Sequence, residues 1–597
     1  IFDDGIVVPA NPNEGGFPIL ERGGNDNFHF APITALDAQG DPSTYSDVIS
    51  YNGSDWSPTG ISITTSVLSG FTEPPLNEDL IETATPPSQP ISIIFISFAD
   101  MGFTGGETIF GYSLSGDDAT TDPALFVDFT NTTNFPTNTV GGSNAGGMDL
   151  MAGGALTKKS FIHTPNGWFD NEDPNATTPG CDDLIIVSGG NASITKDMTV
   201  GELSANDGSL DLGTNTLNVC GDMETINPFS VTGGNLKFIG TTPAGTTAQK
   251  ISSSDANPNT LTIDNLELDN SLGLSVDANI NIKDVLKVTT GDFATPTPAS
   301  NKSVTLFCDF DNPTGPSPFT RHKVGQIGEL TGTITGNITV EQCFPGRRAF
   351  RMVSASTTGG TIHEHWQENA TAWDDNPNLG FGTHITGVSP DPNIDANPDS
   401  TVQDQVNGLD WQPSGNASMF TFNESTQAWD MLLDTETPTL TAGDTYLMMI
   451  RGSRAVDLES NDSPTSDTKL ESTGTIASTP SVSITPNIGN NEFALIGNPY
   501  HAVVDLSQVN ISGNGYTNSI FVFDPNIGGT SNVNPNSTTL GGRGGYVTVD
   551  ATTGTPSVIT GFDVNATDAT NQLQPYQAFF VQADASGTHG AITFQET

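Results

Sequence analysis

The stretch that decides the fold is "TVGELSANDGSLDLGTNTLNVCGD" (Thr199–Asp222), which can be aligned with "TIDNLELDNSLGLSVDANINIKD" (Thr262–Asp284). The alignment matches four pairs of apolar residues: Val200 with Ile263, Leu203 with Leu266, Leu217 with Ile280, and Val219 with Ile282. Short strands that repeat between Asn, Asp and Gly are typical of stacked solenoid coils, because each coil buries its apolar face against the next. The repeat predicts a β-helix-like module, with a plain β-sandwich as the alternative.

This module is expected to span residues 156–345, between two other β-rich regions. Residues 1–155 contain period-two runs such as "ISITTSVLSGF" and "TIFGYSLSG", which predict a β-sandwich domain. Residues 346–597 contain further strand and turn phrases, such as "DTYLMMIRGSR" and "SIFVFDPNIGG", and no sustained helical periodicity. The sequence therefore predicts an all-β protein of tandem β-sandwich and β-helix-like modules.

The composition fits this fold class and limits the partners. The chain has 597 residues with 64 Gly and 39 Pro, a loop-rich balance, and its 69 acidic against 18 basic side chains give a net charge of −51. Such a surface repels phosphates, so nucleic acid is excluded as a partner. Calcium is a possible partner, and the alternative is that the acids keep an extracellular surface hydrated. The longest apolar run, Ile91–Ala99, is too short to span a membrane, so direct membrane insertion is not expected.

The four cysteines are Cys181, Cys220, Cys308 and Cys343. None forms a CxxC pair or lies near a histidine at zinc-finger spacing, which argues against a cysteine metal site. Two disulfides are expected, and pairing in sequence order would join Cys181 to Cys220 and Cys308 to Cys343. Three connectivities are possible, and free buried thiols are the remaining alternative.

The segment "IHEHWQE" (Ile362–Glu368) brings two of the eight histidines close together. On a strand, His363 and His365 would project from one face, but the zincin motif HExxH has its second histidine where Gln367 stands. We therefore expect ordinary strand residues here. The chain also has no GxSxG or Walker loop, so no catalytic residue and no enzymatic activity are predicted.

Asp-rich turns are the positions where a calcium ion is most plausible, because hard cations prefer clustered carboxylate and carbonyl oxygens. None of these turns has the spacing of an EF-hand, and solvated Asx turns are the alternative. The candidate ligands lie in three turns: Asp170, Asp173, Asp309, Asp311, Asp374 and Asp375.

A series of phrases in residues 345–597 resembles a region of large modular secreted proteins of Bacteroidetes, particularly flavobacteria. The phrases include "RRAFRMVSA", "GFGTHITG", "SMFTFNESTQAW", "AGDTYLMMIRG", "FALIGNPY" and "LQPYQAFFVQ". Proteins of this group are exported by the type IX secretion system, and this region usually precedes a C-terminal sorting domain, which these 597 residues do not include. The resemblance implies an extracellular or cell-surface, adhesin-like protein, and it implies no catalytic residues.

The function expected from these features is a non-enzymatic structural or adhesive surface protein. Its partners would be further copies of itself, other surface proteins or glycans, and copies could assemble into a filament or a surface layer. The alternative is a carbohydrate-binding accessory module of a secreted polysaccharide-degrading system. In that case exposed aromatic side chains would stack on sugar rings. The candidates are Trp366, Trp373, Trp411 and Trp429.

Overall fold

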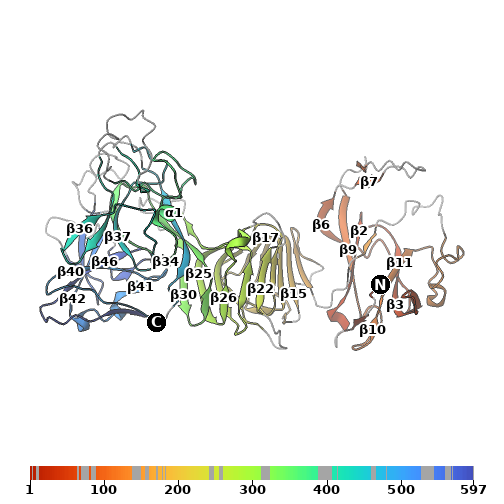
Figure 1. The fold of residues 1–597 in the computed structure, drawn as a ribbon. Coiled ribbons are helices and arrows are strands. Elements are labelled where there is room, and N and C mark those ends of the chain that lie inside the picture. The colour runs from red at the N-terminus through yellow and green to blue at the C-terminus, as the bar shows by residue number, and fades with distance from the viewer. Residues whose placement is uncertain are drawn as a thin grey trace. The chain divides into compact units, whose positions relative to one another are not determined.

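The computed structural model describes most of the chain. The described residues are 1–2, 5–8, 12–63, 66–68, 80–82, 89–136, 150–152, 154, 160–169, 173–177, 179–181, 183–240, 248–253, 260–310, 323–387, 407–412, 415–458, 465–478, 481–525, 527, 544–557, 567 and 569–595. These residues form strands joined by turns, with one short α-helix, which confirms the predicted all-β class (Figure 1). They pack as two compact units: Ile1–Asp211 with Val219–Met223, and Leu212–Asn218 with Glu224–Thr597. The division into three modules stays a prediction.

Two antiparallel sheets pack together near the N-terminus. The first sheet has the strand order β12 (Leu150–Ala152), β2 (Gly16–Arg22), β9 (Gln89–Ser97) and β6 (Ser57–Ile63). The second has the order β11 (Gly111–Gly116), β3 (Phe28–Leu36) and β4 (Pro42–Tyr45), and β5 (Ile49–Tyr51) also pairs with β3. Alternate residues such as Phe17 and Ile96 meet Phe28 and Phe30 in one core. The packing of two inner faces is that of a β-sandwich.

A parallel β-solenoid of about six turns occupies residues 160–306 (Figure 1). In the first unit its strands include β13 (Ser160–Thr164), β15 (Leu184–Ser193), β16 (Met198–Val200) and β17 (Glu202–Asp211). In the second unit they include β20 (Phe229–Thr232), β21 (Asn235–Phe238), β22 (Gln249–Ser253), β23 (Thr260–Asp269), β24 (Leu274–Asp277), β25 (Asn279–Thr290), β26 (Asp292–Ala294) and β27 (Val304–Leu306). The β-helix-like interpretation is therefore confirmed over the plain sandwich for this module.

Neighbouring coils stack like on like. In the parallel pair β23–β25, Leu261 lies beside Ile280 and Ile263 beside Ile282. All four side chains are fully buried, because each points to the inside of the coil and is covered by the equivalent residue of the next coil. The residues between them point outward and are only half-buried. The period-two pattern of the sequence thus determines which side chains fill the interior of the solenoid.

Further strands continue this sheet beyond residue 306. β30 (Gln326–Leu330) pairs in parallel with β25, β31 (Thr333–Thr335) with β26, and β32 (Ile338–Phe344) with β27. On its other side, β32 pairs antiparallel with β38 (Thr468–Ile476). The parallel stack therefore ends where an antiparallel strand from the C-terminal region is added to it.

The four cysteines pair in sequence order, Cys181 with Cys220 and Cys308 with Cys343. Their Cα atoms are 5.5 and 5.9 Å apart, within the usual span of a disulfide. The two bridges join residues 39 and 35 positions apart in the chain. Cys181 precedes β15 and Cys220 follows β18 (Thr216–Val219), while Cys308 lies in the short strand β28 (Cys308–Asp309) and Cys343 in β32, so each bridge cross-links two segments that are distant in the chain.

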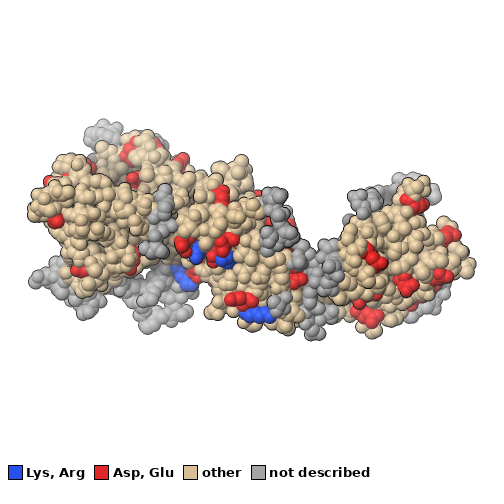
Figure 2. Space-filling view, turned by 90° about the horizontal axis from the view of Figure 1, so that it is seen from below, with Lys and Arg blue, Asp and Glu red and all other residues tan. Residues whose placement is uncertain are grey.

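Lysines of the solenoid are ion-paired with acids of adjacent coils, and Figure 2 shows basic side chains (blue) beside acidic ones (red) there. Lys237 Nζ lies 2.9 Å from Asp269 Oδ2, and Asp277 lies 2.7 Å from Lys302 Nζ and 3.2 Å from Lys250 Nζ. These side chains are partly exposed, so each pair contributes little on its own. Their effect is to compensate the acidic surface of the stacked coils.

Two antiparallel sheets form most of the C-terminal region. One has the order β33 (Ala349–Ser354), β37 (Thr445–Ile450), β35 (Met419–Asn423) and β36 (Ala428–Met431). The other, which we call the five-stranded sheet, has the order β40 (Phe493–Gly497), β46 (Ala578–Ala583), β42 (Tyr516–Asp524), β43 (Gly545–Asp550) and β44 (Pro556–Ser557). The region also contains two separate two-stranded sheets. One pairs β39 (Ser481–Ile484) with β47 (Ile592–Gln595), and the other pairs β41 (Val504–Asp505) with β45 (Gln572–Leu573).

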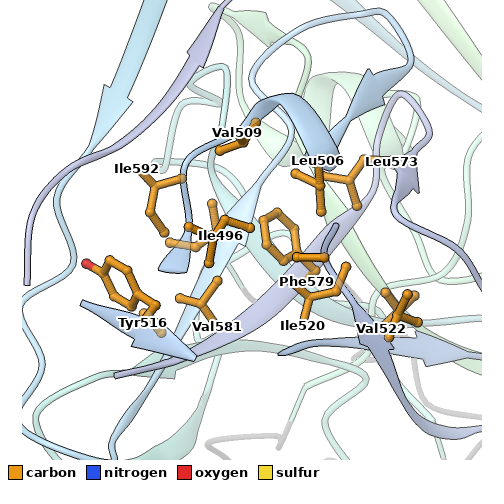
Figure 3. Packing of buried hydrophobic residues seen from close by; sticks show 14 of the residues in the cluster. Ile496, Leu506, Val509, Tyr516, Ile520, Val522, Leu573, Phe579, Val581 and Ile592 are labelled. Carbon is orange, nitrogen blue, oxygen red and sulfur yellow. The ribbon is translucent and has the colours of Figure 1, made fainter. Parts of the chain in front are cut away.

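One face of the five-stranded sheet covers a large apolar core. Ile496, Ile520, Phe579 and Val581 project from three of its strands into this core, as Figure 3 shows. The core is completed by side chains outside the sheet, including Leu506, Val509, Leu573 and Ile592. Because successive side chains of a strand point to opposite faces, the residues between these core positions must lie on the second face of the sheet.

Candidate ligand-binding pocket

The second face of the five-stranded sheet is apolar as well. Phe493, Phe521, Tyr546 and Phe580 alternate in sequence with the residues of the main core, and they therefore point to the opposite side of the sheet. A sheet with one wet face would carry polar residues at these positions. Both faces of this sheet are thus built to contact something other than water.

The sheet that contains β33, β37, β35 and β36 packs against this second face. Met352 of β33 and Leu495 and Phe580 of the five-stranded sheet form a small buried cluster, and Phe422 of β35 and Trp429 of β36 pack on its edge. The contact is incomplete, and a cavity of about 630 Å³ remains between the two sheets. The described residues that line it are Phe422, Gln427, Trp429, Asn491, Glu492, Phe493, Phe521, Tyr546 and Phe580.

The rings around this cavity, which we call the aromatic pocket, touch one another edge to face. The centroids of Phe422 and Phe580 are 4.8 Å apart at an interplanar angle of 79°, and those of Trp429 and Phe580 are 5.7 Å apart at 71°. Phe493 and Phe521 are 5.4 Å apart at 73°. Edge-to-face pairs are a favourable arrangement, and they fix the walls of the pocket before any ligand arrives.

Few polar groups line the aromatic pocket. Gln427 holds the β35–β36 turn against β40, since its amide donates to the Phe493 carbonyl at 2.9 Å and accepts from the Phe493 N–H at 2.8 Å. Burial raises the pKa of Tyr546, and a side-chain hydrogen bond with Trp429 acts in the opposite direction. Among the described lining residues Glu492 is the only charged one. Among the described lining residues, the pocket thus combines aromatic walls with two amides, Gln427 and Asn491, and one carboxylate.

The four tryptophans proposed as sugar-stacking residues have different surroundings. Trp366 is fully buried and Trp411 is nearly so, which removes both from any surface. Trp373 is half-buried and its ring lies 5.8 Å from that of Trp411. Only Trp429 of the four lines the aromatic pocket. Sequence reasoning missed the phenylalanines and Tyr546, although the uninterrupted apolar phrases "IFVF" and "AFFV", which contain Phe521 and Phe580, indicate strands with two apolar faces.

The prediction that "IHEHWQE" is a strand is wrong. Ile362–Trp366 is the α-helix α1, and Thr361 and Glu364 form a capping box at its start. On a helix, residues two apart do not share a face, and the two histidines bind different carbonyls: His363 Nε2 lies 2.9 Å from Ala370 O and His365 Nε2 lies 3.1 Å from Gly359 O. The spacing "TIHE" (Thr361–Glu364) is a capping-box signal in the sequence, and it marks the start of this helix.

A buried ion pair lies next to this helix. The Asp410 carboxylate accepts two hydrogen bonds from Arg454, both 2.9 Å long, and another from Gln367 Nε2 at 3.1 Å. Both charged side chains are 0% exposed. Burial alone would raise the pKa of Asp410, but its interactions with His384 and Arg454 lower it to about 2. With its charge matched and its oxygens bonded, this group is a structural centre of the C-terminal region.

A carboxyl group with a raised pKa, that of Glu471, lies where β32 meets β38. Glu341 and Glu471 face each other across this pair, and Lys469 Nζ lies 2.8 Å from Glu341 Oε2. Burial, with a further contribution from the Glu341 charge, raises the pKa of Glu471 to about 7. Burial and the charge of Glu471 raise the pKa of Glu368 to about 7 as well. Such values also arise in structural networks, and Glu341 is already held by Lys469 and by the Cys308 N–H.

The candidate calcium ligands that lie in the described residues do not come together around one position. Asp173 accepts from the Asn175 N–H, Asp309 pairs with Lys283, and Asp375 accepts from the N–H and hydroxyl of Thr371. Asp374 is exposed, and Asp170 and Asp311 lie outside the described residues. The described part of the chain contains no group of three or more His, Cys, Asp or Glu side chains able to hold a metal ion. Calcium binding stays a prediction.

Fold and pocket together define an all-β protein with a disulfide-linked parallel solenoid and a two-faced sheet that leaves an aromatic pocket. Comparisons with protein-family models, with curated proteins and with solved structures found no match. No helix in the part of the chain that the structure describes is long and apolar enough to cross a membrane.

Proposed function

We propose that this protein is a non-enzymatic, extracellular structural or adhesive surface protein. The observation that carries the proposal is the solenoid: a stack of coils with a dry apolar interior and partly exposed ion pairs between coils. In such a stack each coil contacts only its neighbours, and the outer surface is a regular array of side chains. A scaffold of this kind is suited to presenting contacts to a surface.

The two disulfides support an extracellular location. Cys181–Cys220 and Cys308–Cys343 both cross-link segments 35 or more positions apart, and such bonds persist in oxidising compartments. The sequence resemblance to secreted surface proteins of Bacteroidetes points the same way. An acidic, hydrated surface with a net charge of −51 is also compatible with a protein that works outside the cell.

Adhesion by such a protein would sum several contacts. Binding modules on one scaffold raise the effective concentration of one another, so that individually weak contacts give firm attachment. Assembly into filaments or layers would use the same surface, since an unpaired strand edge can accept a strand from another copy.

Surface attachment and assembly can be measured on the intact chain. We expect the purified protein to be retained on polysaccharide-coated beads, and to form ordered assemblies in electron microscopy and light scattering at some calcium concentration. A protein that stays monomeric at every calcium concentration, and that binds neither polysaccharide nor protein-coated beads, would refute the proposal.

The second candidate function is a carbohydrate-binding accessory module of a polysaccharide-degrading system. The aromatic pocket is the observation that favours it, because Trp429 and its neighbouring rings offer apolar faces to a sugar. Co-purification with a glycan-degrading enzyme, and faster degradation of insoluble polysaccharide when the protein is added, would distinguish it from a purely structural role.

A further inference from the structure

We propose that the aromatic pocket between the β35–β36 hairpin and the second face of the five-stranded sheet binds the rings of a neutral glycan. This inference rests on the proposed adhesive function and gives it a ligand class and a site. The residues that would contact the sugar are Trp429, Phe493, Phe521 and Tyr546, with Asn491 and Glu492 beside them.

The first argument is the amount of aromatic surface that the protein itself leaves uncovered. Tyr546 is 37% exposed, and Trp429, Phe493 and Phe521 are only partly buried. Leaving such rings in water forgoes roughly 25 cal/mol for each Å² of apolar surface. Ligand sites are commonly concave and lined mainly by aromatic and other apolar side chains with a few polar groups, as this pocket is. A ligand with an apolar face would recover that free energy.

The second argument is the shape and the orientation of the rings. The cavity of about 630 Å³ lies in the middle of the range for sites that enclose small organic ligands. Its volume accommodates more than one sugar ring and is far larger than the volume of a single ion. Because neighbouring rings meet at 71–79°, the walls present both ring faces and ring edges. The C–H groups on one side of a pyranose carry partial positive charge, which suits the negative face of an aromatic ring.

The third argument concerns charge. No Lys or Arg is among the described lining residues, while Glu492 is, and the whole chain carries a net charge of −51. Uronic acids, sulfated sugars and fatty acids would therefore be repelled, both at the pocket and at long range. The Glu492 carboxylate and the Asn491 amide can accept and donate hydrogen bonds to hydroxyl groups, which gives a neutral sugar its polar partners.

The experiment uses the full chain and measures binding by calorimetry and by tryptophan fluorescence. The probes are neutral hexose oligosaccharides of several linkages, a uronic acid oligosaccharide, tetramethylammonium, a fatty acid and a proline-rich peptide. We expect a neutral oligosaccharide to bind and to change the fluorescence, with no such change in Trp429→Phe. Tyr546→Ala and Trp429→Ala should each weaken binding about tenfold, since one stacked ring contributes on the order of 1.5 kcal/mol.

Matched variants keep the test specific. Phe129→Ala removes another half-exposed ring in the N-terminal unit, and it should leave sugar binding unchanged. Glu492→Gln removes the single charge among the described lining residues, so it should raise the affinity for the uronic acid oligosaccharide several-fold at low salt. An unchanged melting temperature in Tyr546→Ala shows that lost binding is not lost folding.

Several outcomes would overturn the inference. The first is that the uronic acid, tetramethylammonium, the fatty acid or the peptide binds more tightly than the neutral oligosaccharides. The second is that Tyr546→Ala, Trp429→Ala and the parent chain have equal affinity for the sugar. The third is that no oligosaccharide binds. If beads still retain Tyr546→Ala fully, the inference fails while the adhesive function stands. If soluble sugar binds in the pocket but no surface retains the protein, the adhesive function fails instead.

Discussion

The solenoid and the five-stranded sheet remove their apolar side chains from water in different ways. In the solenoid each strand has one apolar side, as in β25, where Ile280 and Ile282 point inward and the residues between them face water. In the five-stranded sheet β40, β46 and β42 have two apolar sides, as in β42, where Ile520 faces the main core and Phe521 the aromatic pocket. The solenoid therefore covers its apolar side chains by stacking its own coils, whereas the five-stranded sheet needs a second layer of the chain to cover its second apolar face.

This difference suits the solenoid to a supporting role and the five-stranded sheet to binding a ligand. Lysines and acids on the outside of the solenoid form ion pairs with one another, while its apolar strand residues are buried inside the coils. The second layer over the five-stranded sheet is incomplete, so apolar rings remain available. A regular stack that is complete in itself makes a good spacer, and a sheet with a partly open second face makes a good receptor site.

The largest effect is expected from breaking the buried ion pair of the C-terminal region. Asp410→Asn leaves the Arg454 charge buried without a counter-charge, which should cost about 3–5 kcal/mol of unfolding free energy. Tryptophan fluorescence in urea would follow the loss, because Trp366 and Trp411 lie in this region.

The matched control is a carboxylate of the solenoid with two lysine partners. Asp277 lies beside Lys250 and Lys302 but is 44% exposed, so Asp277→Asn should cost no more than about 1 kcal/mol by far-UV circular dichroism. Equal losses in the two variants would mean that burial does not separate the two regions in this way.

The next largest loss of stability is expected from a substitution in the interior of the solenoid. Ile282→Ala removes a fully buried side chain that is stacked between neighbours on both sides, and should cost about 2–4 kcal/mol in urea unfolding followed by circular dichroism. The adjacent outward residue gives the control: Asn281→Ala should change stability by less than about 0.5 kcal/mol.

The aromatic pocket should respond differently to loss of a large side chain. Tyr546 is larger than Ile282 but partly exposed, and Tyr546→Ala should cost about 1 kcal/mol or less. If Tyr546→Ala destabilised the protein as much as Ile282→Ala, the pocket would be part of the core and the contrast between the two regions would fail.

The sequence predicts the solenoid better than the pocket for a physical reason. Coils that stack like on like leave a local period-two pattern, and Leu261 and Ile263 recur as Ile280 and Ile282 in the next coil. The aromatic pocket joins Phe422, Phe521 and Tyr546, whose positions are fixed only by the pairing of distant strands. Nothing in the local pattern around any one of them indicates the others.

The errors around "IHEHWQE" have a similar origin. A helix of five residues has almost no periodicity, so its capping box was the only local signal. The Asp410–Arg454 pair joins residues 44 positions apart in a chain with 69 acidic side chains, which makes the correct partner impossible to select by inspection. The cysteines were easier, because four residues allow only three pairings.

The smallest effect is expected at the junction of β32 with β38, where the carboxyl groups of Glu341 and Glu471 face each other. Glu471 has a folded-state pKa of about 7 against an ordinary value of 4.5, so the folded state holds a proton that the unfolded chain has lost between these values. Its contribution to stability is therefore complete below pH 4.5 and is lost as the pH rises through 7. Relative to Glu471→Gln, the parent chain should lose about 0.5–1 kcal/mol of unfolding free energy between pH 6.5 and pH 8.0.

This pH dependence needs a window without the opposite contribution of His501, and the comparison with Glu471→Gln is needed because Glu368, with a pKa of about 7, titrates in both chains. His501 is buried with a pKa lowered to about 3, so its contribution is lost as the pH falls below 6.5 and has the opposite sign. Urea unfolding of the parent and of Glu471→Gln at pH 6.5, 7.2 and 8.0 avoids that range, and the exposed Glu436→Gln serves as the control. Parallel stability curves for parent and Glu471→Gln would show that β32 and β38 meet without burying a proton. Converging curves toward pH 6.5 would show that this junction, unlike the ion-paired solenoid surface, depends on a neutral carboxyl group.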